Sequence, residues 1–295
     1  MKLVVFMFIC YVIIPFQRIT AQQNTRIESE YKLAVPDSLI DDVALYLSDY
    51  FSGDFLVINS DSLQLEKAVE IFKDSYFDIR SGKLLEQQIG LRHRRRYLNA
   101  ELINELVQLK LPDSEDGVQR QEIKFNVPTK INVLDEMSRK PLLKYVNPSD
   151  RDLLTFNLRK VAVSVDDLRE IVKLTQIRDR IYFSDKKGSV ATVTLDKVKH
   201  ASFPFQGFTE LEIEINESRY TNANNIEKAY LENISEQLKL GITKEFPLLK
   251  IDQTPKYNKL MLLIQNDFLS KINNYFMWAL YGFIVLMACF KFCIV

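Results

Sequence analysis

The chain is poor in the residues that build common redox, zinc and nucleophilic sites. Its three cysteines lie near the two ends, at Cys10, Cys289 and Cys293. Residues 22–274 contain none, which excludes a disulfide framework, a thiolate zinc site and a cysteine nucleophile there. His93 and His200 are the only histidines. They are too few for a His-rich zinc site, and no serine–histidine triad motif accompanies them.

Glycine is scarce and net charge is absent. The eight glycines form no Gly-rich phosphate loop. Lys and Arg number 39 and so do Asp and Glu, which removes any global argument for nucleic-acid binding. A length of 295 residues with 47% hydrophobic residues predicts a globular chain with a substantial core.

The two ends of the chain are strongly apolar. An apolar run ends at Phe16, and Gln17, Arg18 and the exit Ile19-Thr20-Ala21 follow, which is the pattern of a signal peptide over residues 1–21. A retained anchor is the alternative, but roughly 14 apolar residues are short for a span of about 20. In 273–295 only Lys291 is charged, and from Phe276 to Phe290 no face is polar. We therefore expect a transmembrane helix there, with a buried amphipathic helix as the alternative.

Four segments of the middle alternate charged or polar residues with apolar ones, which is the β-strand period. Their polar faces are Glu28, Glu30 and Lys32; Gln108 and Lys110; Arg120, Glu122 and Lys124; and Glu210, Glu212 and Glu214. Two more strand candidates carry Arg92 and Arg94, and Lys173, Arg178 and Arg180. Helices are predicted near residues 37–50, 61–72, 150–159, 166–171 and 224–239.

The charged strand faces allow two interpretations. The simpler is a half-buried antiparallel sheet with one solvated face. Alternatively, a closed barrel would gather the charged faces in one interior and leave the apolar faces for helices to cover. Confined like charges are costly to desolvate, so the carboxylates would need a hard divalent cation and the basic groups a multivalent anion. A metal-bound polyphosphate meets both needs.

Several motifs follow one another in a defined order. The chain reads Glu28-x-Glu30-x-Lys32, Tyr76-Phe77-Asp78, Leu91-Arg92-x-Arg94, Lys110, Arg120-x-Glu122, a basic segment with Lys173, Arg178 and Arg180, Leu195-Asp196, and Glu210-Leu211-Glu212-Ile213-Glu214. From about Arg26 to Asn216 this order resembles the CYTH domain of the triphosphate tunnel metalloenzyme superfamily. The resemblance implies a mainly β fold with flanking helices, built as a closed antiparallel eight-stranded tunnel barrel. We expect the barrel over 22–220, a helical extension over 221–272 and the transmembrane helix over 273–295.

The resemblance also implies a site in which acidic residues hold Mg²⁺ or Mn²⁺ and basic residues hold a triphosphate. The metal ligands would be Glu28, Glu30, Glu210, Glu212 and Glu214. The phosphate-binding residues would be Lys32, Arg92, Arg94, Lys110, Arg120, Lys173, Arg178 and Arg180. The catalytic residues would be Glu28, Glu30, Lys32 and Glu122.

We therefore expect a divalent-metal-dependent hydrolase of inorganic tripolyphosphate or of a nucleoside or organic triphosphate. The alternative is a membrane-tethered protein that binds polyphosphate or a phosphorylated ligand without catalysis. Lys124, at a position where many members of the superfamily have a carboxylate, favours the alternative, whereas the retained glutamates favour the enzyme. No nucleic-acid partner is expected, and the oligomeric state stays open. The barrel would lie on the extracytoplasmic side of a membrane that the single C-terminal helix crosses.

Overall fold

Eight long strands close into an antiparallel barrel, which confirms the predicted fold. The computed structural model describes residues 25–58, 61–112, 118–128, 142–203 and 205–266. Around the barrel the strands are β1 (Thr25–Val35), β6 (Gln119–Asn126), β5 (Glu101–Pro112), β4 (Gly90–Leu98), β3 (Asp61–Asp78), β7 (Arg169–Asp185), β8 (Gly188–His200) and β9 (Gly207–Ile215). Strand β1 closes the ring because its first half pairs with β6 and its second half with β9.

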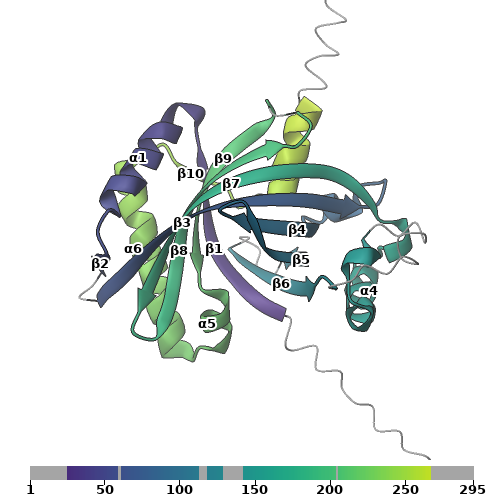
Figure 1. Cartoon of the computed structure of the whole chain (residues 1–295), viewed down its shortest axis with the longest axis horizontal. Helices are drawn as coiled ribbons and strands as arrows, with labels where there is room; N and C mark the ends of the chain where they lie inside the picture. Colours follow the sequence, from purple (N-terminus) through teal and green to yellow (C-terminus); the bar gives the residue numbers. More distant parts are fainter. Residues whose placement is uncertain (1–24, 59–60, 113–117, 129–141, 204, 267–295) are drawn as a thin grey trace, which may run out of the picture.

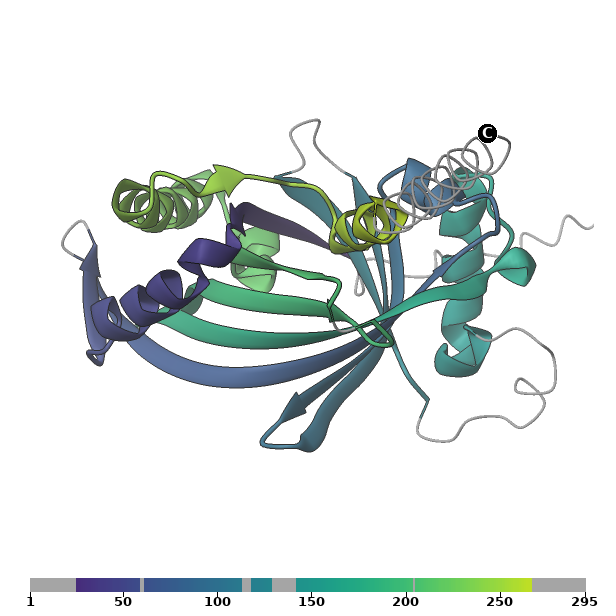
Figure 2. The same ribbon diagram turned by 90° about the horizontal axis from the view of Figure 1, so that it is seen from above.

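Shorter elements extend and cover the barrel (Figures 1 and 2). Strand β2 (Phe55–Ile58) pairs with β3, and β10 (Lys250–Ile251) pairs with β1. The helices are α1 (Ile40–Tyr50), α2 (Lys83–Glu86), α4 (Arg151–Lys160), α5 (Glu217–Asn222), α6 (Asn225–Glu245) and a last helix over 256–266. Single 3-10 turns are η2 (Asp37–Leu39), η3 (Leu143–Tyr145), η4 (Pro148–Asp150) and η5 (Val165–Asp167). The helices predicted near 37–50, 150–159 and 224–239 are therefore confirmed, as α1, α4 and α6.

The apolar faces of the strands point outward and form the core beneath the helices. Helices α1 and α6 lie at one end of the barrel and α4 at the other (Figure 1). Leu33 and Leu211 are fully buried in a cluster that also contains residues of α1 and α6. Leu109 and Leu158 belong to a second cluster beneath α4. Side chains alternate along a strand, so one face of each strand points out of the barrel and the other into it. Because the apolar faces pack outward against the helices, the charged faces point into the barrel interior.

The helix predicted over residues 61–72 is wrong, because this segment begins the 18-residue strand β3. Its many Leu, Glu, Lys and Ala residues favour a helix locally. However, β3 pairs with β7 from Gln64 to Asp78, and with β4 along its second half. This long-range pairing overrides the local preference. The helix predicted over 166–171 is likewise reduced to the turn η5, after which β7 begins.

The two predicted targeting segments, 1–21 and 273–295, lie outside the described residues. Within the part of the chain that the structure describes, no helix is long and apolar enough to cross a membrane.

Gly207 marks a close approach between β8 and β9. A Cβ atom added there would lie 2.4 Å from the carbonyl oxygen of Val198. We expect Gly207→Ala to lower the free energy of unfolding by about 1–3 kcal/mol, because the backbone must shift to remove the overlap. Denaturant unfolding measures this loss. Gly53→Ala is the control, since its Cβ would lie 3.6 Å from its nearest neighbour, the carbonyl oxygen of Phe55; equal losses in both variants would contradict the prediction.

Candidate active site: a charged tunnel inside the barrel

The barrel encloses a cavity of about 490 Å³ that is lined mainly by charged side chains. Its eleven basic lining residues are Arg26, Lys32, Arg92, Arg94, Arg96, Lys110, Arg120, Lys124, Arg178, Arg180 and Lys256. Its six acidic lining residues are Glu28, Glu30, Glu122, Glu212, Glu214 and Glu217. The lining thus has an excess of five positive charges. Five buried acids outside the lining, Glu70, Asp74, Asp78, Asp196 and Glu210, equal this excess in formal charge.

Most of the predicted site residues are brought together in this lining. They are Glu28, Glu30, Lys32, Arg92, Arg94, Lys110, Arg120, Glu122, Arg178, Arg180, Glu212 and Glu214. Glu210 is fully buried and does not line the cavity. The shared interior, rather than a solvated sheet face, is therefore what the alternating charged residues build.

Lys173 is a predicted phosphate ligand that the structure places outside the tunnel. Its side chain is 57% exposed, and its ammonium lies 2.9 Å from Glu170. Lys173 is five residues from Arg178, and an odd separation along a strand puts two side chains on opposite faces. The structure thus corrects the prediction that Lys173 binds phosphate.

The same strand supplies a matched test of this correction. Arg180 lines the cavity, seven residues beyond Lys173 on β7. We expect Arg180→Ala to raise the KM for a triphosphate about tenfold, because a charge-assisted hydrogen bond to phosphate is worth roughly 1.5–3 kcal/mol. Lys173→Ala should leave KM unchanged. Steady-state phosphate release measures both, and a KM increase in the Lys173 variant alone would show that the assignment of faces is wrong.

One wall of the tunnel is a set of arginines held in place by buried acids. Asp74 on β3 accepts hydrogen bonds from Arg94 at 2.8 and 2.6 Å and from Arg92 at 3.3 Å. Burial alone would raise the pKa of Asp74, but the two guanidinium groups outweigh burial and lower it. The ring of Phe72 lies 4.3 Å from the guanidinium carbon of Arg94 and 5.3 Å from that of Arg178. These basic groups are therefore oriented without any ligand.

Arg120 and Glu122 face the cavity from β6, beside Lys124. Arg120 is 2% exposed, and within the described residues its Nε atom has no hydrogen-bond partner. Glu122 accepts a hydrogen bond from Gln108 at 2.8 Å and pairs with Lys124 at 2.8 Å. Burial would raise the pKa of Glu122, but Lys110 and Lys124 lower it, so this carboxylate stays ionised. Lys124 thus neutralises an acid of the tunnel wall, and among the described residues the Nε atom of Arg120 is left as an unused donor.

Three glutamates of β1 and β9, namely Glu28, Glu30 and Glu214, line the cavity together. Glu30 lies directly opposite Glu214 in the strand register, and Glu28 binds Lys110 at 2.5 and 2.6 Å. Burial and the charges of Glu28 and Glu30 raise the pKa of Glu214 to about 8. The nearby lysines thus do not fully balance these carboxylates. A hard divalent cation prefers oxygen ligands of this kind, so the donor set fits Mg²⁺ or Mn²⁺.

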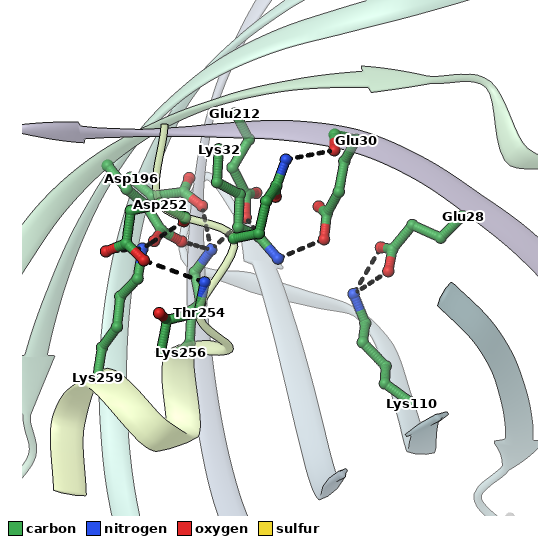
Figure 3. Close-up of polar contacts among 12 residues, drawn as sticks. Glu28, Glu30, Lys32, Lys110, Asp196, Glu212, Asp252, Thr254, Lys256 and Lys259 are labelled. Atoms are coloured by element: carbon green, nitrogen blue, oxygen red, sulfur yellow. Dashed lines mark hydrogen bonds and ion pairs between the residues drawn. The ribbon is translucent and has the colours of Figure 1, made fainter. Parts of the chain in front are cut away.

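A second acidic cluster is already bound to lysines (Figure 3). Oxygen atoms of Asp196, Glu210 and Glu212 all lie within 4.8 Å of one another. The ammonium of Lys256 lies 2.9 Å from Asp196 and 2.6 Å from Glu212, and it also contacts Glu210. Lys259 lies 2.7 Å from Glu210. The predicted set of five metal-binding glutamates is therefore divided into two lysine-bound groups: Lys256 and Lys259 hold Glu210 and Glu212, whereas Lys110 and Lys32 hold Glu28 and Glu30.

Sequence reasoning gave no site role to several of these residues. Glu70, Phe72 and Asp74 are spaced two residues apart on β3 and point toward the tunnel. This spacing was not interpreted as a strand because the segment was predicted to be a helix. Asp196 belongs to a motif that the sequence does show. Lys256 lies in the predicted helical extension, where no motif marks it.

Comparisons with known proteins reveal similarity at the level of solved structures. No family model and no curated protein matches the chain. HpAC1 from Hippeastrum, a proposed adenylyl cyclase with a dominant triphosphatase activity, is similar with a TM-score of 0.48 and 18% identity, over 79% of this chain and 93% of that one. A proposed adenylate cyclase from Bacillus halodurans is similar with a TM-score of 0.46 and 18% identity, over 74% of this chain and 90% of that one. The S. pombe RNA triphosphatase Pct1 is similar with a TM-score of 0.32 and 11% identity, over 84% of each chain.

Proposed function

We propose that the protein is a metal-dependent hydrolase of triphosphate-containing molecules. The observation that carries this proposal is an enclosed tunnel in which oriented guanidinium groups face the carboxylates of Glu28, Glu30 and Glu214. Such an interior suits a multivalent anion together with a divalent cation, because each satisfies charges that the other cannot. A protein that only bound anions would gain nothing from carboxylates beside its ligand.

The residues divide between metal, phosphates and water. Glu28, Glu30 and Glu214 would hold Mg²⁺ or Mn²⁺, which supplies Lewis-acid neutralisation of phosphate oxygens when bound. Arg92, Arg94, Arg120, Arg178 and Arg180, with Lys32 and Lys110, would hold the phosphate groups. The ionised Glu122 would accept a hydrogen bond from the attacking water and orient it.

Hydrolysis then breaks one phosphoanhydride bond. The water oxygen forms a bond to the attacked phosphorus as the bond from that phosphorus to the bridging oxygen breaks. The leaving phosphate keeps the electron pair, and the proton of the water passes to solvent or to a phosphate oxygen. Charge develops on oxygens that the fixed guanidinium groups already face, so little reorganisation of the site is needed.

A phosphate-release panel on the full chain tests this function. The substrates are tripolyphosphate, ATP, thiamine triphosphate and long-chain polyphosphate, each with Mg²⁺, with Mn²⁺ and with a chelator. We expect release from at least one substrate with a metal and none with the chelator. Tight binding of tripolyphosphate without hydrolysis under either metal would replace the enzyme with the non-catalytic binding protein.

We further propose that the barrel lies outside the cytosol and that one C-terminal helix anchors it. The support is the sequence pattern of 1–21 and 273–295. Protease protection on intact cells tests this topology, since added protease should digest the barrel. A barrel that is digested only after the membrane is opened would show the opposite orientation.

A further inference from the structure

The helix over 256–266 brings a lysine into one end of the tunnel. Lys256 is its first residue and is 7% exposed. Its ammonium contacts all three acids of the Asp196–Glu210–Glu212 cluster. Burial would lower the pKa of Lys256, but the three carboxylates raise it well above its usual value, so it stays charged. Figure 3 shows Lys256 extending from the helix toward Asp196 and Glu212.

The contacts of this ammonium are those that a bound cation would make. Carboxylate oxygens that converge within 4.8 Å suit a small hard cation. Lys256 supplies instead a compact ammonium that donates a hydrogen bond to Glu212 at 2.6 Å and forms ion pairs with Asp196 and Glu210. We propose that Lys256 is an internal cation that takes the place of a metal ion in this cluster and so confines divalent metal to the Glu28–Glu30–Glu214 group. The confinement of metal to the Glu28–Glu30–Glu214 group rests on the proposed function. The role of Lys256 as an internal cation does not.

Charge balance explains why a metal ion and Lys256 exclude each other. The three acids face three close cations, namely Arg178, Lys256 and Lys259. Lys32 lies 4.0 Å from Glu212 and pairs more closely with Glu30. The cluster is therefore neutral, and a divalent ion would bring two uncompensated buried charges. Removing the ammonium of Lys256 leaves one negative charge and opens the position between the carboxylates. A divalent ion could then bind with its oxygen ligands already in place.

The helix is seated by contacts that do not involve the ammonium. The ring of Tyr257 stacks on Tyr76 with centroids 5.2 Å apart, and its hydroxyl donates to Asp78 at 3.2 Å. Leu260 is fully buried in the same cluster of apolar residues. Substitution of Lys256 should therefore leave the helix in position, and a change in metal binding can be assigned to the lost charge.

Counting bound Mn²⁺ per chain tests the proposal without measuring hydrolysis. Equilibrium dialysis of the full chain should find one more Mn²⁺ bound to Lys256→Met than to the wild type. Lys256→Gln should give the same gain, which covers the case that the methionine variant does not fold. Adding Asp196→Asn to either variant should abolish the gain. Circular dichroism and thermal unfolding check that each variant is folded.

A matched variant separates this site from the proposed metal centre. Lys110→Met removes a lysine from Glu28 and should leave the number of bound ions at the wild-type value. The proposal would be overturned if both Lys256 variants fold but bind no more Mn²⁺ than the wild type. It would also be overturned if Asp196→Asn, made alone, binds one Mn²⁺ fewer than the wild type. A wild type that binds no ion, with a gain of one in Lys256→Met, would support the internal cation and count against the proposed metal centre.

Discussion

Glu30→Gln is expected to lower the turnover of triphosphate hydrolysis by at least about 10²-fold, the scale of losing one preorganised electrostatic group. Glu30 is 2% exposed and lies opposite Glu214, so glutamine keeps the volume and removes one charge from the proposed metal ligands. Lys32, which contacts Glu30, would also lose its carboxylate partner. The affinity for Mn²⁺ should fall together with turnover. Phosphate release at saturating substrate and a Mn²⁺ titration measure the two effects.

Glu101→Gln is the control for this experiment, because Glu101 is exposed at the start of β5 and does not line the cavity. It should retain the wild-type rate. A Glu30→Gln protein that hydrolyses every triphosphate at the wild-type rate would show that the metal site is misassigned.

The largest effect on stability is expected for Asp74→Ala. Asp74 is 2% exposed and accepts hydrogen bonds from Arg92 and Arg94. Its removal leaves two buried guanidinium groups without their anion, which costs about 3–5 kcal/mol of unfolding free energy. Saturating tripolyphosphate should raise the unfolding midpoint of the variant more than that of the wild type, because the ligand supplies anionic oxygens to the same groups. Denaturant unfolding with and without tripolyphosphate measures both effects.

An exposed ion pair provides the comparison. Glu170 pairs with Lys173 at 2.9 Å, but their side chains are 39% and 57% exposed. Glu170→Ala should therefore cost no more than about 1 kcal/mol, with no dependence on tripolyphosphate. If Asp74→Ala cost as little as Glu170→Ala, the arginines of the tunnel wall would not depend on Asp74.

The composition and the alternation of the sequence determined which kinds of chemistry the tunnel can hold. Without cysteine in 22–274 and with two histidines, the site had to be built from carboxylates and basic groups. The period of two put Glu28 with Glu30, and Arg92 with Arg94, on one face of each strand. The resemblance to the tunnel fold implied that these faces share an interior, and the structure places them there. This succeeded because the direction of a side chain on a strand follows from local backbone geometry. The same parity, applied to Lys173, would have placed it outside.

Only the tertiary structure decided which charged groups meet. Residues 61–72 form a strand because β7 pairs with them from about a hundred residues away, and this pairing turns Glu70 and Asp74 inward. The division of the glutamates depends on the register of β1 against β9 and on a lysine from a helix far along the chain. Distances between side chains on different elements depend on register and packing, which local propensity does not specify. The sequence by itself therefore determined the composition of the tunnel, whereas the fold decided which carboxylate meets which lysine or arginine.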